Sequence, residues 1–442
     1  MKKVTTPLEG HPHKVLPTLK RELGLFHVTA YGVGLILGAG IYVLAGKAAG
    51  VAGNAVWLSF LIAAIVAALT GLSYAELSSR FSKDSGEFYY VMKAMGKNIG
   101  LLVGNLVIFA GIISTSAVAL GFAGYFSSLF SLPDILGIAL VATVLFSLVN
   151  FMGIKQAAWL NVVFTAIEVG GLLLIIGLGS RFIGSVNYLS FPSLQGVFSA
   201  SALVFFSFLG FQSIVKLSEE TKKPAKTIPK ALLLSILITT IIYILIGVSI
   251  VSVMDWQALG VSASPLADVA AAVMGSKAFV LLAIIALFST ANTVLIGLIS
   301  VSRIIYGMGR EHSLPRFLGK IHEKTKTPLN SIVVATVLVL LFILMGDISL
   351  IANTTNFVVF VIFIFVNLSV ILLRFRSAPA KSKSRFSIPL SIGKIPLPAV
   401  LGILASLFMI CQLDGQVLLL GSALIVVLLL IQWLMGFFRK LR

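Results

Sequence analysis

The chain has 442 residues, of which 58% are hydrophobic and 11% are charged, and its mean hydropathy is +1.08. Because a soluble domain carries roughly 25% charged residues, this composition excludes a soluble protein of this size and predicts an all-α protein that crosses a membrane many times. The single cysteine, Cys411, excludes a disulfide framework and a thiol metal site. The charged N-terminus leads into an apolar segment too long for a signal-peptide core, so we expect no cleaved leader.

Apolar stretches of about 20 residues, long enough to cross a hydrocarbon core of ~30 Å as a helix, recur along the chain. We predict twelve transmembrane helices, at residues 25–46, 54–77, 98–127, 134–152, 157–180, 196–218, 230–253, 278–303, 329–346, 349–373, 395–413 and 416–438.

The net charge of +18 is divided unevenly between the two sides of these predicted spans. Lys47, Arg181 and Lys277 fall on the side opposite the N-terminus, whereas the large Lys and Arg clusters fall on the N-terminal side. The positive-inside rule therefore predicts that both termini are cytoplasmic. We expect the protein to lie in the cell membrane. The basic excess is explained by topology and by attraction to anionic lipid, so we expect no nucleic-acid partner and no obligatory protein partner.

The spans divide the chain into four predicted parts without any soluble domain. Residues 1–22 form a cytoplasmic N-terminal segment, and residues 23–181 contain the first five helices. Residues 195–375 contain the next five helices, and residues 395–442 contain helices eleven and twelve with a cytoplasmic C-terminus. Because five is an odd number, the second group of five enters the membrane from the opposite side.

The first span of each group carries an interruption. The run GVGLILGAGIYVLAG at residues 32–46 contains five glycines, and we predict a break at Gly38-Ala39-Gly40. The sixth span is predicted to break around residues 207–210. Glycine also allows close helix packing, and Gly34 with Gly38 forms a small-xxx-small pair. Paired interruptions at corresponding places of two inverted halves nevertheless indicate a secondary transporter with its ligand cavity at the breaks.

The first break predicts a site for a carboxylate. The N–H groups of Gly38, Ala39, Gly40 and Ile41 would face a substrate carboxylate, helped by the positive end of the following half-helix. Glycine allows the unwound dihedral angles and the close approach of a ligand.

The second break predicts the complementary site. The carbonyl groups of Phe205, Phe206 and Ser207 would accept hydrogen bonds from an α-ammonium group, and Phe206 or Phe208 would close over the substrate as a gate. The same aromatic residues also fit an ordinary core or lipid-facing role.

Glu168 lies in the middle of the fifth span, with no other acid or base within ten residues on either side. An ionised carboxylate at that depth costs several kcal/mol, so we expect it to be neutral, paired or ion-bound. We predict a coupling-ion site for H⁺ or Na⁺ at Glu168, completed by the hydroxyls of Ser289 and Thr290 and the backbone of Gly34 and Leu37. A permanently protonated acid with a structural hydrogen bond is the alternative.

Other charged and polar residues fit structural roles. Glu76 lies at the cytoplasmic end of the second span, and we expect Glu219 and Glu220, at the end of the sixth span among lysines, to form gate or loop ion pairs. The five histidines have neither metal-ligand spacing nor a nucleophile partner. We therefore expect no enzyme, no metal site and no cofactor beyond the coupling ion.

Three motifs carry a resemblance to a known family. LGAGIYVLAG resembles the first-helix motif of the cationic amino acid transporter branch of the amino acid–polyamine–organocation superfamily. FFSFLGFQSIVKLSEETKKPAKTIPKA resembles the sixth-helix pattern of that superfamily, and SRIIYGMGREHSLPRFLGKIHEKTKTPLNSI is similar to its loop between helices eight and nine. The similarity runs in order from about residue 20 to 375.

The resemblance implies the five-plus-five inverted repeat of the leucine-transporter type, with two additional C-terminal helices, and amino-acid transport. Two departures concern the site. Glu168 stands where proton-coupled relatives often carry a lysine, and Val359 stands where relatives of this branch have a threonine. Because of the first departure, the sequence does not determine which ion is coupled to transport. Because of the second, it does not determine which substrate side chain is bound.

The sequence therefore predicts a proton-coupled amino-acid symporter that works by alternating access. A Na⁺-coupled symporter and an obligate amino-acid exchanger are the alternatives within the same fold. A channel is the alternative from a different class, although one isolated carboxylate does not supply the repeated polar lining that a channel uses.

Overall fold

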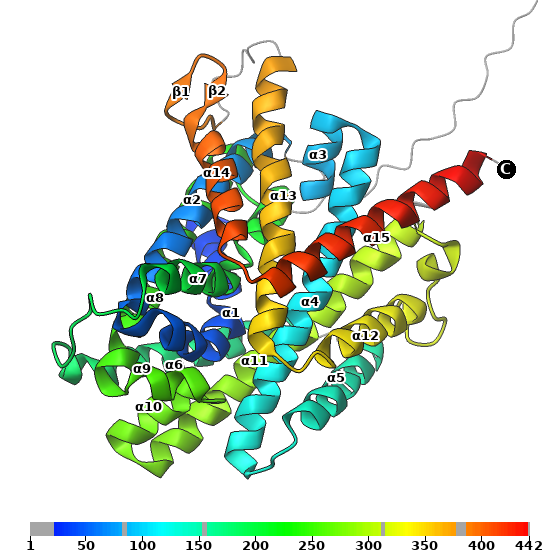
Figure 1. Ribbon diagram of the computed structural model, residues 1–442. Coiled ribbons are helices and arrows are strands. Elements are labelled where there is room, and N and C mark those ends of the chain that lie inside the picture. Colours follow the sequence, from blue (N-terminus) through cyan, green and yellow to red (C-terminus); the bar gives the residue numbers. More distant parts are fainter. Residues whose placement is uncertain (1–21, 82–85, 153–156, 311–313, 377–385, 441–442) are drawn as a thin grey trace, which may run out of the picture.

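The computed structural model describes residues 22–81, 86–152, 157–310, 314–376 and 386–440 (Figure 1). These residues are nearly all helical. The α-helices are α1 (Leu25–Ala52), α2 (Val56–Arg80), α3 (Glu87–Met95), α4 (Lys97–Phe130), α5 (Ile135–Met152), α6 (Ala157–Gly179), α7 (Leu194–Val204), α8 (Pro224–Val253), α9 (Trp256–Val261), α10 (Pro265–Met274), α11 (Ser276–Arg310), α12 (Leu329–Ile343), α13 (Ile348–Arg376), α14 (Leu397–Cys411) and α15 (Gly415–Lys440).

Shorter elements connect these helices. The 3₁₀ turns are η1 (Gly53–Ala55), η2 (Ser180–Phe182), η3 (Phe205–Phe208), η4 (Phe211–Glu219) and η5 (Arg316–Gly319). The strands β1 (Ser391–Ile392) and β2 (Ile395–Pro396) pair antiparallel as a small hairpin before α14.

The described residues confirm a multi-pass membrane protein but not the predicted count of twelve spans. Nine helical stretches are long and apolar enough to cross a membrane within the described ranges, and the first of them, Leu25–Arg80, runs through both α1 and α2. The predicted spans 329–346 and 395–413 appear as α12 and α14, which have 15 residues each. Such helices rise only about 22 Å, which is less than the ~30 Å of a typical hydrocarbon core.

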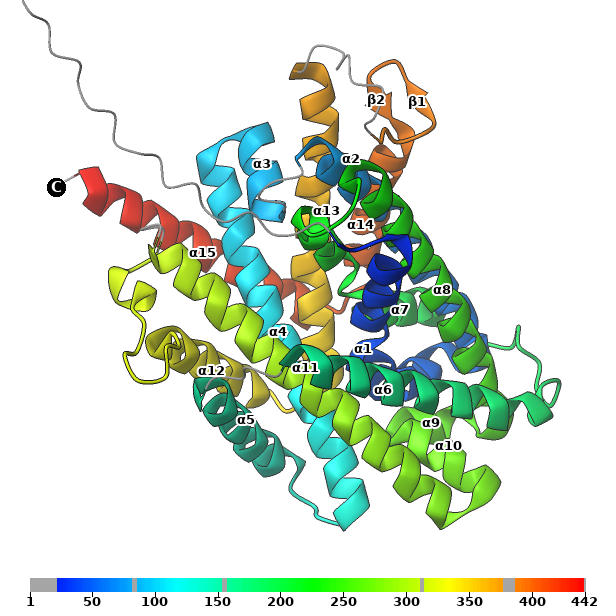
Figure 2. The ribbon, with the colours of Figure 1, turned by 180° about the vertical axis from the view of Figure 1, so that it is seen from behind.

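Helices from the two predicted groups of five pack against one another. α1 packs on α7 and α8, and α2 packs on the same two helices. α4 packs on α11 and α13, and α5 packs on α12. Figures 1 and 2 show α5 and α12 side by side at one edge of the bundle, away from α8. Helices far apart in the sequence therefore form the centre of the molecule.

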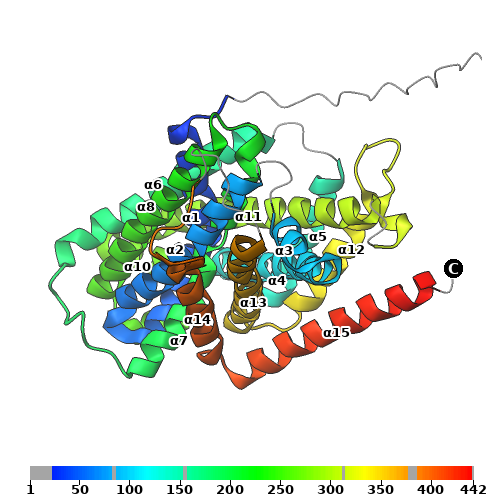
Figure 3. The same ribbon diagram turned by 90° about the horizontal axis from the view of Figure 1, so that it is seen from above.

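The two C-terminal helices lie at the periphery. α14 packs on α13 and α2, whereas α15 contacts α13 and α4. Seen from above, α15 runs outward from the end of α14 along one edge of the bundle (Figure 3). The exposed apolar side chains of α15, among them Leu419, Val426, Leu430 and Trp433, suit contact with lipid.

Two short helices that the sequence did not predict, α9 and α10, cover the C-terminal end of α1. The Lys47 ammonium group donates a hydrogen bond of 2.9 Å to the Gly260 carbonyl oxygen. A Cβ added at Gly50 would lie 2.6 Å from the Cα of Gly260, so the two backbones touch. This contact closes the end of α1 that lies away from the N-terminal segment.

At the opposite end, a buried ion cluster joins α2 to α13 and to the segment before the hairpin. Glu76 is fully buried, and its carboxylate accepts hydrogen bonds from Arg80 and Arg374 and from the Ile388 backbone N–H. We call this end, which carries α3 and the basic ends of α2 and α13, the basic face. The two ion pairs among the described residues both belong to Glu76, so the ion pair predicted for Glu220 is not observed. The side chain of Glu219, for which the same was predicted, lies outside the part of the chain that the structure describes.

Candidate functional site

Two interrupted helices meet in the middle of the bundle. Within α1, Gly38 is non-helical, with φ −2° and ψ −177°. In the sixth predicted span, α7 and η3 end at Phe208, Leu209 is extended, and Gly210 has φ +122°. Only glycine adopts that φ without steric cost, which explains why the chain turns there. Both predicted breaks are therefore present.

The two breaks touch each other. A Cβ added at Gly210 would lie 2.5 Å from the carbonyl oxygen of Leu35, and one added at Gly40 would lie 2.9 Å from the Cα of Ser207. Real side chains do not tolerate such distances without displacement of a neighbour. The glycines at these positions therefore bring the two unwound segments into direct backbone contact.

A tyrosine on α8 contacts both segments. The Tyr243 hydroxyl lies 2.7 Å from the carbonyl oxygen of Ile36 and 2.8 Å from the carbonyl oxygen of Ser207. A phenol has one proton to donate, so the two carbonyl groups share a single donor. Tyr243 is fully buried and links the last helical turn before one break to the other break.

The backbone groups predicted to bind the substrate lie at this contact. Ala39 and Ile41 are buried at the start of the second half of α1. In the second segment, the Phe206 carbonyl accepts the Leu209 N–H, while the Ser207 hydroxyl is buried without a hydrogen-bond partner among the described residues. An unpaired buried hydroxyl costs free energy, so a ligand at this point would satisfy it.

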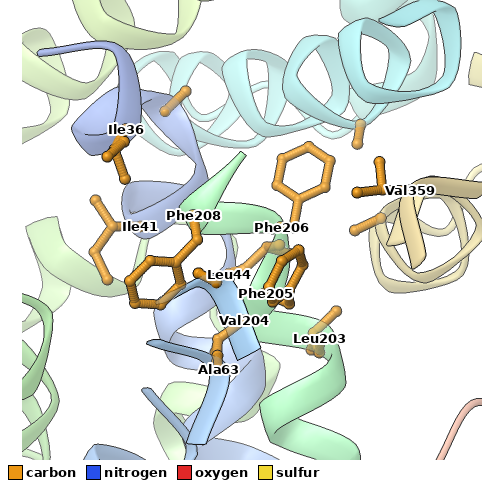
Figure 4. Close-up of a cluster of buried hydrophobic side chains, with 14 of the residues drawn as sticks. Ile36, Ile41, Leu44, Ala63, Leu203, Val204, Phe205, Phe206, Phe208 and Val359 are labelled. Carbon is orange, nitrogen blue, oxygen red and sulfur yellow. The ribbon is translucent and has the colours of Figure 1, made fainter. Parts of the chain in front are cut away.

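The three phenylalanines of η3 differ in their surroundings (Figure 4). Phe205 packs on Phe360, with ring centroids 4.8 Å apart, and Phe208 packs edge-on against Tyr243 at 5.1 Å. Figure 4 shows the Phe206 ring directed toward Val359. Val359 lines the cavity described below, and the role of Phe206 or Phe208 as a gate stays a prediction.

Glu168, the centre of the predicted ion site, lies on α6. This residue is 4% exposed, and the Ser289 hydroxyl donates a hydrogen bond of 2.6 Å to its Oε1 atom. The Tyr42 hydroxyl donates a hydrogen bond of 2.6 Å to the Glu168 backbone carbonyl. A Cβ added at Gly34 would lie 2.7 Å from the Thr165 side chain, so α1 and α6 are in close contact one helical turn from Glu168.

The remaining members of the predicted ion site are less directly placed. The Thr290 hydroxyl donates to the carbonyl oxygen of Ala286 in its own helix, and Leu37 is fully buried one turn after Gly34. The structure thus pairs Glu168 with Ser289 rather than with Thr290. Among the described residues, no group of three His, Cys, Asp or Glu side chains is suited to hold a metal ion.

A cavity of about 250 Å³ extends from the second break toward the basic face. Leu209 and Gly210 line it beside the break, and Thr293 lines it on α11. Thr293 also lies near Gly38, because its Oγ1 atom is 4.0 Å from a Cβ added at that glycine. Residues 38–41 and 205–208 are not among the lining residues, so their predicted contact with substrate stays a prediction.

Comparison with known proteins identifies the family. The family model described as amino acid permease matches residues 23–434. The chain belongs to the amino acid permease family. The resemblance of its motifs to the amino acid–polyamine–organocation superfamily is therefore confirmed.

The permease is similar to several curated transporters. It is 32% identical over 333 residues to the branched-chain amino acid permease of Bacillus subtilis, a match that covers 70% of this chain and 72% of the relative. It is 29% identical over 402 residues to cationic amino acid transporter 4 of Mus musculus, covering 84% of this chain and 62% of the relative. A vacuolar cationic amino acid transporter 4 of Arabidopsis thaliana is 29% identical over 390 residues, covering 82% of this chain and 64% of that protein. These relatives are permeases and transporters, so the permease is a transport protein and not an enzyme.

Sequence reasoning missed several residues of the permease that line the cavity. On α4 they recur as Val107, Ala110, Gly111, Ser114 and Thr115, and on α11 as Thr293, Ile296, Gly297, Ser300, Val301 and Ile304. These spacings place each set on one face of a helix. A small and polar stripe on an otherwise apolar span was the signal that could have identified them.

Proposed function

We propose that the permease is a secondary active transporter that carries an amino acid across the cell membrane by alternating access, coupled to protons. The observation that carries this proposal is the contact of the two interrupted segments, Gly40 against Ser207 and Gly210 against Leu35, beside a cavity that reaches the basic face. Irregular backbone at membrane depth is tolerated where it lines a cavity, and paired broken helices are typical of secondary transporters.

The packing of the helices supports a five-plus-five inverted repeat with twelve spans. In that scheme α2 corresponds to α8, α4 to α11, and α5 to α12, and each packs on its counterpart. The contact of α4 with α13 has its equivalent in the contact of α11 with α6. The positive-inside rule favours a cytoplasmic basic face.

The backbone of the two breaks recognises the groups common to all amino acids. The N–H groups of residues 38–41 bind the carboxylate, while the carbonyls of residues 205–207 and the unpaired Ser207 hydroxyl bind the ammonium group. Relatives are named for branched-chain and for cationic amino acids. A thermal-shift screen of the twenty amino acids on the purified protein identifies the substrate as the amino acid that raises the unfolding temperature.

Protonation of Glu168 is proposed to couple transport to the proton gradient. The ionised carboxylate only accepts hydrogen bonds, whereas the protonated form also donates one, so its bond with Ser289 changes with the proton. On α11, the Thr293 hydroxyl donates to the Ser289 carbonyl, and the same hydroxyl lies near Gly38. A displacement of α11 therefore reaches the first break.

Uptake into proteoliposomes tests the proposal. We expect saturable amino-acid uptake with counterflow, stimulated by an inward proton gradient without Na⁺. Uptake that requires Na⁺ identifies the Na⁺-coupled symporter, and uptake that requires internal amino acid identifies the exchanger. Flux that neither saturates nor shows counterflow identifies a channel and contradicts the proposal.

The variant Glu168→Gln tests the coupling residue. Because Gln keeps the shape but does not take up a proton, we expect its uptake to lose stimulation by the proton gradient while counterflow continues. Glu22→Gln, an exposed glutamate at the start of the described chain, is the matched control. Normal gradient-driven uptake by Glu168→Gln contradicts the proposed coupling.

A further inference from the structure

The cavity beside the breaks continues toward the basic face. A second cavity, of about 190 Å³, shares Glu87, Val107, Lys216 and Ile304 with the first. Along α11 the two cavities extend from Thr293 to Met308, which at 1.5 Å per residue is a path of about 22 Å. The cavities therefore follow one route from the breaks to the basic face.

Glu87 contributes a buried carboxylate to this route. It is 6% exposed at the start of α3, and the Tyr74 hydroxyl donates a hydrogen bond of 3.0 Å to its Oε1 atom. The Tyr74 ring packs edge-on against Phe211, with centroids 5.8 Å apart, and against Phe363 at 6.1 Å. Tyr74 is the one side chain that donates a hydrogen bond to Glu87 within the described ranges.

Lys216 contributes the opposite charge. Gly210, Ser213 and Lys216 all line the first cavity from η4 and the residue before it. A 3₁₀ turn has three residues per turn, so these residues form a row that leads from the break to the Lys216 ammonium group. Glu87 and Lys216 do not pair with each other, since both ion pairs of the described residues involve Glu76. The two charged residues thus line the same cavity without forming an ion pair with each other.

We propose that Glu87 and Lys216 form a second amino-acid site at the basic end of the route, distinct from the site at the breaks. Glu87 binds the α-ammonium group of the amino acid and Lys216 binds its α-carboxylate, so the pair matches the two charges of a zwitterion. This inference rests on the proposed transport function. From Thr293 to Ile304 the path is about 16 Å long, which is longer than an amino acid, so the substrate occupies the two sites in turn.

The second site is expected to be weak at its Lys216 end. Lys216 is exposed, and an ion pair that remains in contact with water contributes at most about 1 kcal/mol, which corresponds to roughly fivefold in affinity. Weak binding suits a site that the amino acid must leave quickly. Because the site opens on one face of the membrane, a substitution in it is expected to affect uptake mainly from that face.

The substrate concentration that gives half-maximal uptake, measured from each face of the membrane, tests the proposal. Uptake of tritiated L-leucine and L-arginine is measured in cells, which expose one face, and in inside-out membrane vesicles, which expose the other. We expect Glu87→Gln and Lys216→Met to raise the half-saturating concentration about fivefold at one face, and by less than a factor of about two at the other. Glu323→Gln and Lys324→Met change the same charges at exposed positions outside both cavities and are the matched controls.

Partial substrates distinguish binding from a structural role. 3-Methylbutylamine is leucine without its carboxylate, and 4-methylpentanoate is leucine without its ammonium group. At the affected face, uptake by Glu87→Gln should no longer be inhibited by the amine but should still be inhibited by the acid. Uptake by Lys216→Met should no longer be inhibited by the acid but should still be inhibited by the amine. Equal effects at both faces, unchanged half-saturation, or unchanged inhibition overturns the second site while leaving the transport function intact. Absence of uptake by the wild-type protein contradicts the proposed function, and this site with it.

Discussion

The hydroxyl of Tyr243 lies 2.8 Å from the carbonyl oxygen of Ser207, at the break of the sixth span. The same hydroxyl lies 2.7 Å from the carbonyl oxygen of Ile36, in the last turn before the break of the first span. Since one proton serves two acceptors, motion of either segment away from α8 transfers the hydrogen bond entirely to the other. Tyr243 is therefore positioned to respond when the two segments separate.

Tyr243→Phe should slow transport without unfolding the protein. The substitution removes the hydroxyl and leaves a buried carbonyl short of a donor, which costs about 1–3 kcal/mol, while the ring keeps its edge-on contact with Phe208. We expect the initial rate of uptake in proteoliposomes to fall about tenfold. Tyr306→Phe on α11 is the control for loss of a phenol. Equal uptake by the two variants would show that the shared hydrogen bond does not serve transport.

Ser289→Ala and Thr290→Ala form a matched pair at the ion site. Ser289 donates to Glu168, whereas Thr290 donates to the backbone of its own helix. We expect Ser289→Ala to weaken the stimulation of uptake by an inward proton gradient several-fold, because the carboxylate loses its one side-chain donor among the described residues. Thr290→Ala should change that stimulation much less. The reverse order would place the coupling ion nearer Thr290.

The breaks could be predicted from the sequence because their cause is local. The φ of +122° at Gly210 is one that other residues rarely adopt, and the positions of Gly38 and Gly210 in the first and sixth spans show which helices are interrupted. An isolated glutamate in an apolar span likewise requires a partner. The contact of Glu168 with Ser289 follows that expectation, although its role in coupling remains a prediction.

The rest of the site depends on tertiary contacts that local patterns do not encode. Tyr74 and Tyr243 look like ordinary aromatic residues in their spans, and the distances to Glu87 and to the carbonyls appear only when α2 and α8 are packed. Glu87 lies between the second and third predicted spans, outside every segment that was predicted to cross the membrane. The short helices α9 and α10 were missed for a related reason, because six and ten residues give a weak periodic signal.

Gly40→Ala tests the contact between the two breaks. The added methyl group would lie 2.9 Å from the Ser207 Cα and 3.1 Å from its Oγ atom, so backbone would have to move. Overpacking of this kind costs about 1–3 kcal/mol, and we expect lower thermal stability together with loss of uptake. Gly170→Ala, on an exposed part of α6 with nothing within 4 Å, should leave uptake intact and gain slightly from helix propensity. Wild-type stability of Gly40→Ala would contradict the close contact.

The ion cluster of Glu76 should control the stability of the basic face. Arg374 donates two hydrogen bonds to the Glu76 carboxylate from another helix, whereas Arg80 donates from four residues away on the same helix and is more exposed. Removing one partner of a buried ion pair costs about 3–5 kcal/mol, and the Ile388 N–H offsets part of that loss. We therefore expect Arg374→Met to lower the midpoint of thermal unfolding clearly more than Arg80→Met, and the exposed control Arg181→Met to have no effect. If Arg374→Met unfolds at the temperature of Arg181→Met, the cluster does not hold α2 to α13.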